Sequence, residues 1–197
     1  MRNIKGAALV LLLFLLAACE TTFTPKPRGY FKIQFPEKKY RVFDQPGYPY
    51  TFEYPVYANV IKDSLFFGEA PENPYWINVD FPSLNGKIYM SYKIIGAHNN
   101  DFQKLINDAF KMTFKHSSKA EYIDERTIHT PNQVSGTFYE VGGNAASAKQ
   151  FFATDSVKHF LRGALYFNAS PNADSLAPVQ QFLEQDMWHL VETLRWR

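Results

Sequence analysis

The chain contains one cysteine, Cys19, and this residue directly follows a short apolar run. Arg2 and Lys5 precede the run, which covers residues 6–18. A positively charged start followed by an apolar stretch is the plan of a bacterial export signal. The 13 residues of the run fall short of the roughly 20 that a helix needs to cross a bilayer, so we expect no permanent transmembrane segment here. The fold must therefore be built from the residues after Cys19.

The last residues of the apolar run resemble the lipobox that lipoprotein signal peptidase reads. They are Leu16-Ala17-Ala18-Cys19, with small side chains before the cysteine that takes the lipid. The alternative is an ordinary small-residue cleavage site next to a chance cysteine. The tetrapeptide, its position and the absence of any other cysteine favour the lipobox. It implies a signal peptide over 1–18 and lipid attachment at Cys19. Each buried methylene contributes about 0.8 kcal/mol, so two or three acyl chains would hold the protein on a membrane.

Acylation of Cys19 would leave no cysteine for a disulfide or a thiol nucleophile. An exported domain without disulfides must be stabilised by its hydrophobic core. A chain of 197 residues with 46% hydrophobic residues can build one such core. Loss of Arg2 and Lys5 with the signal lowers the number of basic residues from 21 to 19, which equals the number of acidic ones. A neutral, exported chain gives no indication of nucleic-acid binding.

Alternation of apolar and polar residues predicts most of the secondary structure. Strands are predicted over 48–57, 75–81, 88–94, 121–130, 133–141, 149–155 and 158–169. Pro49 and Pro55 favour an edge position for the first of these strands, because proline has no backbone donor. Asn85-Gly86 lies between the second and third strands and is a preferred pair for a tight hairpin turn.

Two segments show helical spacing instead. Residues 100–116 carry an apolar stripe, with Asn100 and Asp101 suited to the amino end. A second helix is predicted from about Leu176 to the end, with Pro178 in its first turn. Strands, a helix, more strands and a final helix predict an α+β fold, with a mostly antiparallel sheet flanked by both helices. We expect one domain over 30–197, joined to Cys19 by a linker over 19–29.

The residues that usually carry catalysis do not form a recognisable pattern. The five histidines have no metal-ligand spacing and no zinc signature. Asp155, Ser156 and His159 suggest a triad, but they span an expected hairpin turn without a nucleophile elbow. The aromatic residues could line a glycan-binding groove, although core packing explains most of them. The sequence predicts no enzyme, no metal site and no cofactor.

The most distinctive stretch of the mature chain is a basic, aromatic arm over 30–44, preceded by TPKPRG. It has three interpretations: a first strand beginning at Tyr30, a docking segment for a protein partner, or a contact with anionic lipid. Under the docking interpretation aromatic side chains anchor the partner and cations steer it. The candidate partner-binding residues are Arg28, Tyr30, Phe31, Lys38 and Lys39.

The lipobox, followed by TPKPRGYFKIQFPEKKY and YWINVDFPSLNGKIYMSYK, resembles the gliding motility lipoprotein GldD family of Bacteroidetes. The stretches VSGTFYEVGG, KQFFATDS, HFLRGALYF and LAPVQQFLEQDMWHLVETLRW resemble Mog1/PsbP-like domains in pattern. The family resemblance implies a non-catalytic outer-membrane lipoprotein without a cofactor. It implies a requirement in gliding motility, or in assembly and stability of the type IX secretion apparatus. The implied partners are other envelope lipoproteins of that machinery.

Two expectations remain beside this resemblance. Surface-displayed lipoproteins of Bacteroidetes resemble one another in an acidic cluster after the cysteine. Here Glu20 is the only acid in residues 20–24, which predicts a periplasm-facing protein. The alternative function is a periplasmic lipoprotein that binds a glycan or lipid in an aromatic groove.

Overall fold

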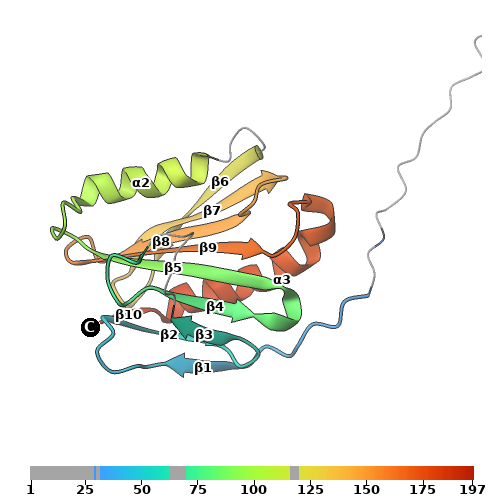
Figure 1. Ribbon diagram of the computed structural model, residues 1–197, viewed down its shortest axis with the longest axis horizontal. Helices are drawn as coiled ribbons and strands as arrows, with labels where there is room; N and C mark the ends of the chain where they lie inside the picture. Colours follow the sequence, from blue (N-terminus) through green and yellow to red (C-terminus); the bar gives the residue numbers. More distant parts are fainter. Residues whose placement is uncertain (1–28, 30–31, 63–69, 116–119) are drawn as a thin grey trace, which may run out of the picture. The chain divides into compact units, whose positions relative to one another are not determined.

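A computed structural model describes residues 29, 32–62, 70–115 and 120–197. The compact unit spans Gln34–Arg197, and of the segment before it only Gly29, Lys32 and Ile33 are described. Its elements are β1 (Tyr40–Phe43), β2 (Tyr50–Pro55), β3 (Asn59–Lys62), β4 (Ile77–Phe81), the 3-10 turn η1 (Pro82–Leu84), β5 (Gly86–Ile94), α2 (Phe102–Phe114), β6 (Ala120–His129), β7 (Ser135–Gly143), β8 (Lys149–Thr154), β9 (His159–Phe167), α3 (Ala173–Thr193) and β10 (Arg195–Trp196) (Figure 1).

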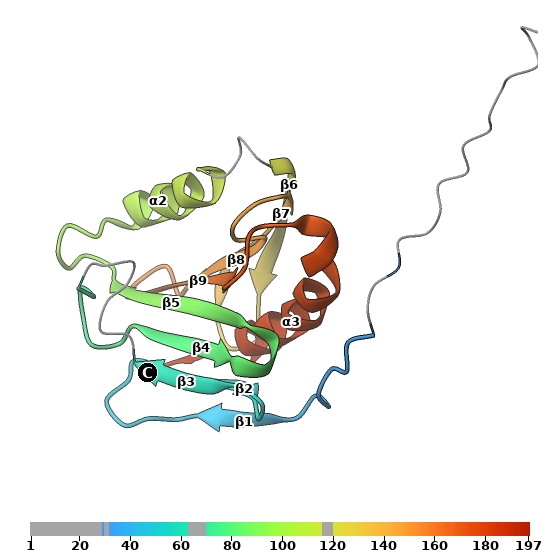
Figure 2. The same ribbon diagram turned by 45° about the vertical axis from the view of Figure 1, so that its right-hand side comes forward.

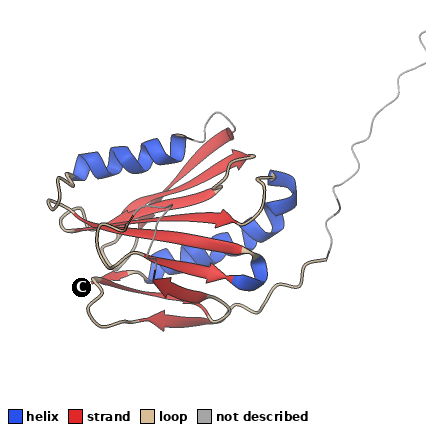
Figure 3. Cartoon of the chain, viewed as in Figure 1, coloured by secondary structure: helices blue, strands red, loops and turns tan. Residues whose placement is uncertain are grey.

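The main sheet has seven strands in the order β3-β4-β5-β9-β8-β7-β6, and every neighbouring pair in it is antiparallel. Figure 3 shows this sheet together with the two helices. The α+β fold with a mostly antiparallel sheet and two flanking helices is therefore confirmed. The hairpin of β4 and β5 is confirmed as well, but its connection is longer than the tight Asn85-Gly86 turn that was expected. It consists of η1 and Asn85, which is left-handed at φ 51°, and Gly86 is already the first residue of β5.

A smaller sheet consists of β1, β2 and β10, with β2 in the middle. The prediction of an edge position for this strand was wrong. Its prolines lie at its margins, since Pro49 precedes β2 and Pro55 is its last residue. Neither proline therefore removes a hydrogen bond from the interior of the ladder. β10 contributes only Arg195 and Trp196, and so short a strand has no periodicity by which it could be recognised.

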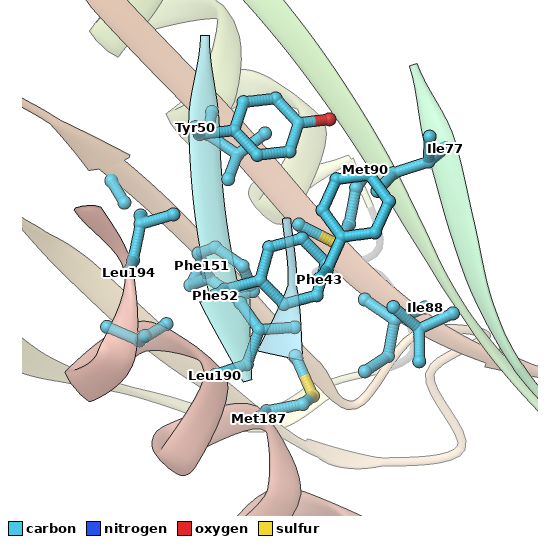
Figure 4. Packing of buried hydrophobic residues seen from close by; sticks show 14 of the residues in the cluster. Phe43, Tyr50, Phe52, Ile77, Ile88, Met90, Phe151, Met187, Leu190 and Leu194 are labelled. Atoms are coloured by element: carbon cyan, nitrogen blue, oxygen red, sulfur yellow. The ribbon is translucent and has the colours of Figure 1, made fainter. Parts of the chain in front are cut away.

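The main core lies between one face of the large sheet, the small sheet and α3. Tyr50 and Phe52 from β2, Met90 from β5 and Met187 from α3 are all at most 1% exposed there (Figure 4). Alternation places Tyr50 and Phe52 on the same face of β2, because successive residues of a strand point to opposite sides. The core is therefore shared by both sheets and by the carboxyl-terminal helix.

Helix α2 covers part of the opposite face of the large sheet. Leu105 and Ala109 of α2 pack on Tyr139, Phe152 and Phe160 from β7, β8 and β9. Figure 2 shows α2 and α3 on either side of strands β6–β9. Because α2 reaches only this part of the sheet, the outer sides of β4 and β5 take no part in either hydrophobic cluster.

The two helices begin at residues with capping side chains. The Asp101 carboxylate accepts a hydrogen bond from the backbone N–H of Lys104 at 3.1 Å, as the sequence predicted for the amino end of α2. At α3 the prediction was three residues late, because Asn172 caps the helix by accepting from the N–H of Ser175. Pro178 therefore lies inside α3, beyond its first turn.

Candidate functional site

Four of the residues singled out from the sequence, Cys19, Arg28, Tyr30 and Phe31, lie outside the described residues. The other two, Lys38 and Lys39, belong to the compact unit and differ sharply from each other. The side chain of Lys38 is 24% exposed and faces α3, whereas that of Lys39 is 64% exposed. Two adjacent lysines thus have different environments.

Residues 34–39 contain no helix or strand and are attached to α3 by side chains. We call them the strap. The ring of Phe35 stacks on the ring of Phe182 with centroids 4.3 Å apart. The Nζ atom of Lys38 lies 3.6 Å from the centroid of the Phe182 ring and donates to the carbonyl oxygen of the same residue at 2.7 Å. One residue of α3 therefore holds the strap by an aromatic stack, a cation–π contact and a hydrogen bond.

The carboxylate of Asp186, one turn further along α3, is the centre of this site. Asp186 is 1% exposed, and its Oδ1 atom lies 2.7 Å from the Nζ of Lys38. The hydroxyl of Tyr40 donates to Oδ1 at 3.0 Å, and that of Tyr57 donates to Oδ2 at 2.6 Å. A buried carboxylate is tolerated only when it is paired and hydrogen-bonded, and here both oxygens are occupied. The strap, β1 and the segment after β2 thus all meet on α3.

The electrostatics of the site follow from burial. Burial lowers the pKa of Lys38, although its hydrogen bond and its attraction to Asp186 oppose the shift. Burial and the negative charge of Asp186 raise the pKa values of Tyr40 and Tyr57. Both hydroxyls therefore remain protonated donors through the physiological range. The carboxylate of Asp186 contacts one ammonium group and two hydroxyl groups, all from other segments of the chain. We therefore interpret it as a structural contact between these segments and not as a group that transfers protons.

The exposed side chains of this region form a separate set. Lys39 pairs with Glu37 at 2.7 Å, and both side chains are largely in solvent. Arg41 is exposed, donates to the carbonyl oxygen of Ala58 at 2.8 Å and lies 4.7 Å from the ring centroid of Tyr54. Exposed pairs of this kind contribute little to stability. Because the side chains of Lys39 and Arg41 are exposed, both cations are accessible to another molecule.

Sequence reasoning missed Asp186, Tyr57 and Phe182 as parts of one site. One signal was present in the sequence. Asp186 lies three residues after Leu183 and one before Met187, within the apolar stripe of α3. An acid at such a position needs a buried partner. The identity of the partner was not visible, because Lys38 lies far away in the sequence.

A second buried charge joins α3 to the large sheet. Lys149 of β8 is 4% exposed and lies 2.8 Å from Glu140 and 2.6 Å from Glu184. Arg126 also pairs with Glu184, and its guanidinium lies 4.9 Å from the ring centroid of Trp188. Burial would raise the pKa of Glu184, but hydrogen bonds from Lys149 and Arg126 outweigh it and lower this pKa. This network of ion pairs joins α3 to β6, β7 and β8.

The suspected triad is a turn, as the sequence favoured. The Oδ1 of Asp155 accepts from the backbone N–H groups of Val157, Lys158 and His159 at 2.8–3.0 Å. The Nδ1 of His159 lies 2.7 Å from the hydroxyl of Tyr92, and its ring stacks on Trp196. No group of three or more histidine or acidic side chains in the described part of the chain is arranged to hold a metal. Within those same residues, no helix has the length and apolar character needed to cross a bilayer.

The model of the family described as gliding motility lipoprotein GldD matches residues 20–196. The fold is similar to the solution structure of cyanobacterial PsbP from Synechocystis sp. PCC 6803, at 12% identity and a TM-score of 0.45, covering 87% of this chain and 100% of that chain. No curated protein matches the chain significantly.

Proposed function

The chain belongs to the gliding motility lipoprotein GldD family, and from this membership we propose that it is a non-catalytic outer-membrane lipoprotein that supports assembly or stability of the gliding and type IX secretion apparatus. Membership makes the chain a gliding-motility-associated lipoprotein of the cell envelope. The outer membrane, the periplasmic orientation and the link to type IX secretion belong to the proposal.

The observation that carries the proposal is the extent of the family match. It begins at residue 20, directly after the lipobox cysteine, and ends at residue 196. A match of this extent includes both the folded unit and the basic segment between it and the anchor. A scaffold role is supported by two buried charged residues, Asp186 and Lys149. Their ion pairs join elements of the fold to each other.

The proposed anchor is tested by Cys19→Ala. We expect this change to abolish acylation, so that the protein either moves to the soluble fraction or keeps its uncut signal. Fractionation and mass measurement report both outcomes. Protease added to intact cells should leave the wild-type protein uncut, because it would face the periplasm. A Cys19→Ala protein that is processed and still bound to the membrane contradicts the anchor.

For the partner, we propose contact through Arg28, Tyr30, Phe31 and Lys39, with Lys38 holding the strap against α3. An extended linker covers at most about 3.5 Å per residue, so Arg28, Tyr30 and Phe31 would stay within roughly 40 Å of the bilayer and Lys39 within roughly 70 Å. A partner in the same membrane, such as another lipoprotein of the machinery, would meet these residues there. The different exposure of the two side chains supports these different roles, because Lys39 is 64% exposed and Lys38 only 24%.

Two substitutions separate a protein partner from a lipid surface. Arg28→Lys keeps the charge but loses the planar guanidinium, so a lipid surface tolerates it and a protein pocket does not. Tyr30→Ala removes an aromatic anchor before the folded unit begins. We expect both variants to impair gliding or secretion at normal protein level, and to lose the partner in an envelope pull-down. Val157→Ala, at a side chain that is 78% exposed, is the control. Normal gliding and secretion in Arg28→Lys cells would argue against a protein pocket.

A further inference from the structure

The outer face of the large sheet carries a cavity of about 530 Å³ that neither the strap site nor the proposed function uses. Its size falls within the range of about 300–1,000 Å³ that is usual for small-molecule sites. It lies where β4, β5 and β9 run side by side beyond the reach of α2. The residues that matter for its chemistry are Asp80, Asn85, Lys87, Tyr89, Tyr166 and Asn168.

Strand register builds the floor of this groove. Asp80 of β4 pairs with Lys87 of β5, and Lys87 pairs with Tyr166 of β9, so these three side chains form one row across the sheet. Tyr89 follows two residues after Lys87 and points to the same side. It meets Tyr166 in a T-shaped contact with centroids 5.6 Å apart and an interplanar angle of 85°. Two aromatic rings thus adjoin a pair of opposite charges.

One end of the groove is closed by two turns that are hydrogen-bonded to each other. The side-chain amide of Asn85 donates to the carbonyl oxygen of Asn168 at 3.0 Å, and the N–H of Asn168 donates to the carbonyl oxygen of Asn85 at 3.1 Å. The turn after β4 and the end of β9 are therefore fixed to each other. A site closed by such contacts exists before any ligand arrives, which lowers the entropic cost of binding.

The charges of the groove restrict the class of ligand. The Nζ of Lys87 lies 3.6 Å from the carboxylate of Asp80, so the pair brings no net charge. A carboxylate only accepts hydrogen bonds and an ammonium group only donates them. A ligand that contacts both must donate and accept, as hydroxyl groups do. The tyrosine rings offer apolar surface for C–H groups. We propose that this groove binds a neutral saccharide, such as a mono- or disaccharide unit of an envelope glycan.

The test is direct binding by the acylated protein in a zwitterionic detergent without a sugar head group. Maltose, cellobiose and N,N′-diacetylchitobiose are titrated one by one, and saturation-transfer NMR and calorimetry report binding. We expect saturable binding of at least one of them. Tyr89→Ala and Tyr166→Ala should weaken it at least tenfold. Tyr122→Ala, at a tyrosine that is 48% exposed on β6 and outside the groove, should leave it unchanged.

Asp80→Asn provides a variant that keeps the shape of the groove. It removes the charged acceptor and should weaken saccharide binding several-fold, with the melting temperature near that of the wild type. Glucose 6-phosphate serves as the charged probe beside glucose. Tighter binding of the phosphate would overturn the neutral-ligand assignment. Saturable binding of none of the three disaccharides would overturn the site, as would equal binding by the Tyr89→Ala protein. The partner and motility experiments do not depend on these outcomes.

Discussion

At the scale of single residues, two adjacent lysines of the basic arm contribute differently to the fold. Lys38 and Lys39 are indistinguishable by composition, yet one side chain pairs with a buried carboxylate and the other with an exposed one. An exposed pair contributes about 0–1 kcal/mol, whereas breaking a buried pair costs about 3–5 kcal/mol. Of these two lysines, Lys38 therefore makes the larger contribution to folding, through its pair with Asp186 of α3.

Asp186→Asn should destabilise the protein by about 2 kcal/mol or more. The charge of Lys38 then loses its partner while most of its side chain remains buried, and its remaining exposure keeps the cost below that of a fully buried pair. Urea denaturation measures the change. Glu37→Gln removes the carboxylate of the exposed pair and should stay within about 0.5 kcal/mol of the wild type. Equal stability of the Asp186→Asn protein would mean that Lys38 finds sufficient solvation elsewhere.

The sequence analysis did not reveal this pairing, although it singled out Lys38 as part of the basic arm. The acid within the apolar stripe of α3 was overlooked, and the arm offered several cations as partners. The choice between them depends on a contact between the two ends of the chain. Periodicity and composition describe local preference, and neither carries such long-range information.

At the scale of elements, local signals predicted the fold well. Alternation located six of the seven strands of the large sheet but missed β3, and Asp101 marked the start of α2, because these features depend on neighbouring residues. The errors concern elements whose neighbours in the structure lie far away in the sequence, or elements that are short. β2 became a central strand through β10, and β1 begins at Tyr40, well after the Tyr30 start that a first-strand interpretation of the arm required.

Truncation tests where the folded unit begins. A mature, non-acylated chain that starts at Gln34 should melt within a few degrees of the longer chain, because the compact unit begins there. A chain that starts at Tyr40 loses Phe35 and Lys38 and leaves Asp186 without its cation. We expect it to lose about 3 kcal/mol, or roughly 6–12 °C. Similar melting temperatures for the two truncated chains would show that the strap adds no stability.

At the scale of the whole molecule, tyrosines dominate the response to alkaline pH. Burial is the main cause of the raised pKa of each of these tyrosines: Tyr40, Tyr48, Tyr50, Tyr57, Tyr92, Tyr122, Tyr139 and Tyr166. A raised folded-state pKa means that the unfolded chain loses its protons first, near pH 10. The stability from these groups is complete below that pH and is lost as the pH rises through the folded-state values, about 12 for Tyr92.

We therefore expect the free energy of unfolding to fall steeply above about pH 10. Each fully buried tyrosine contributes a slope of about 1.4 kcal/mol per pH unit, and Tyr50 and Tyr92 are at most 1% exposed. The lowered pKa values of Lys38 and Arg162 act in the opposite direction, but the tyrosines outnumber these two groups. Urea denaturation at a series of pH values measures the slope, and Tyr50→Phe should reduce it. A constant free energy of unfolding up to about pH 11 would contradict this account.

The position of the strap also has a mechanical consequence. In an acylated protein, tension on the tether would enter the folded unit at Gln34 and reach the contacts of Phe35 and Lys38 before any strand. These contacts are made by side chains, and they would break one after another. Among the residues that the structure describes, the first backbone hydrogen bond along the chain is the one from the N–H of Val56 to the carbonyl oxygen of Lys39. Release of residues 34–38 would lengthen the tether by roughly 17 Å while both sheets remain intact. The strap would thus yield under load before the sheets do.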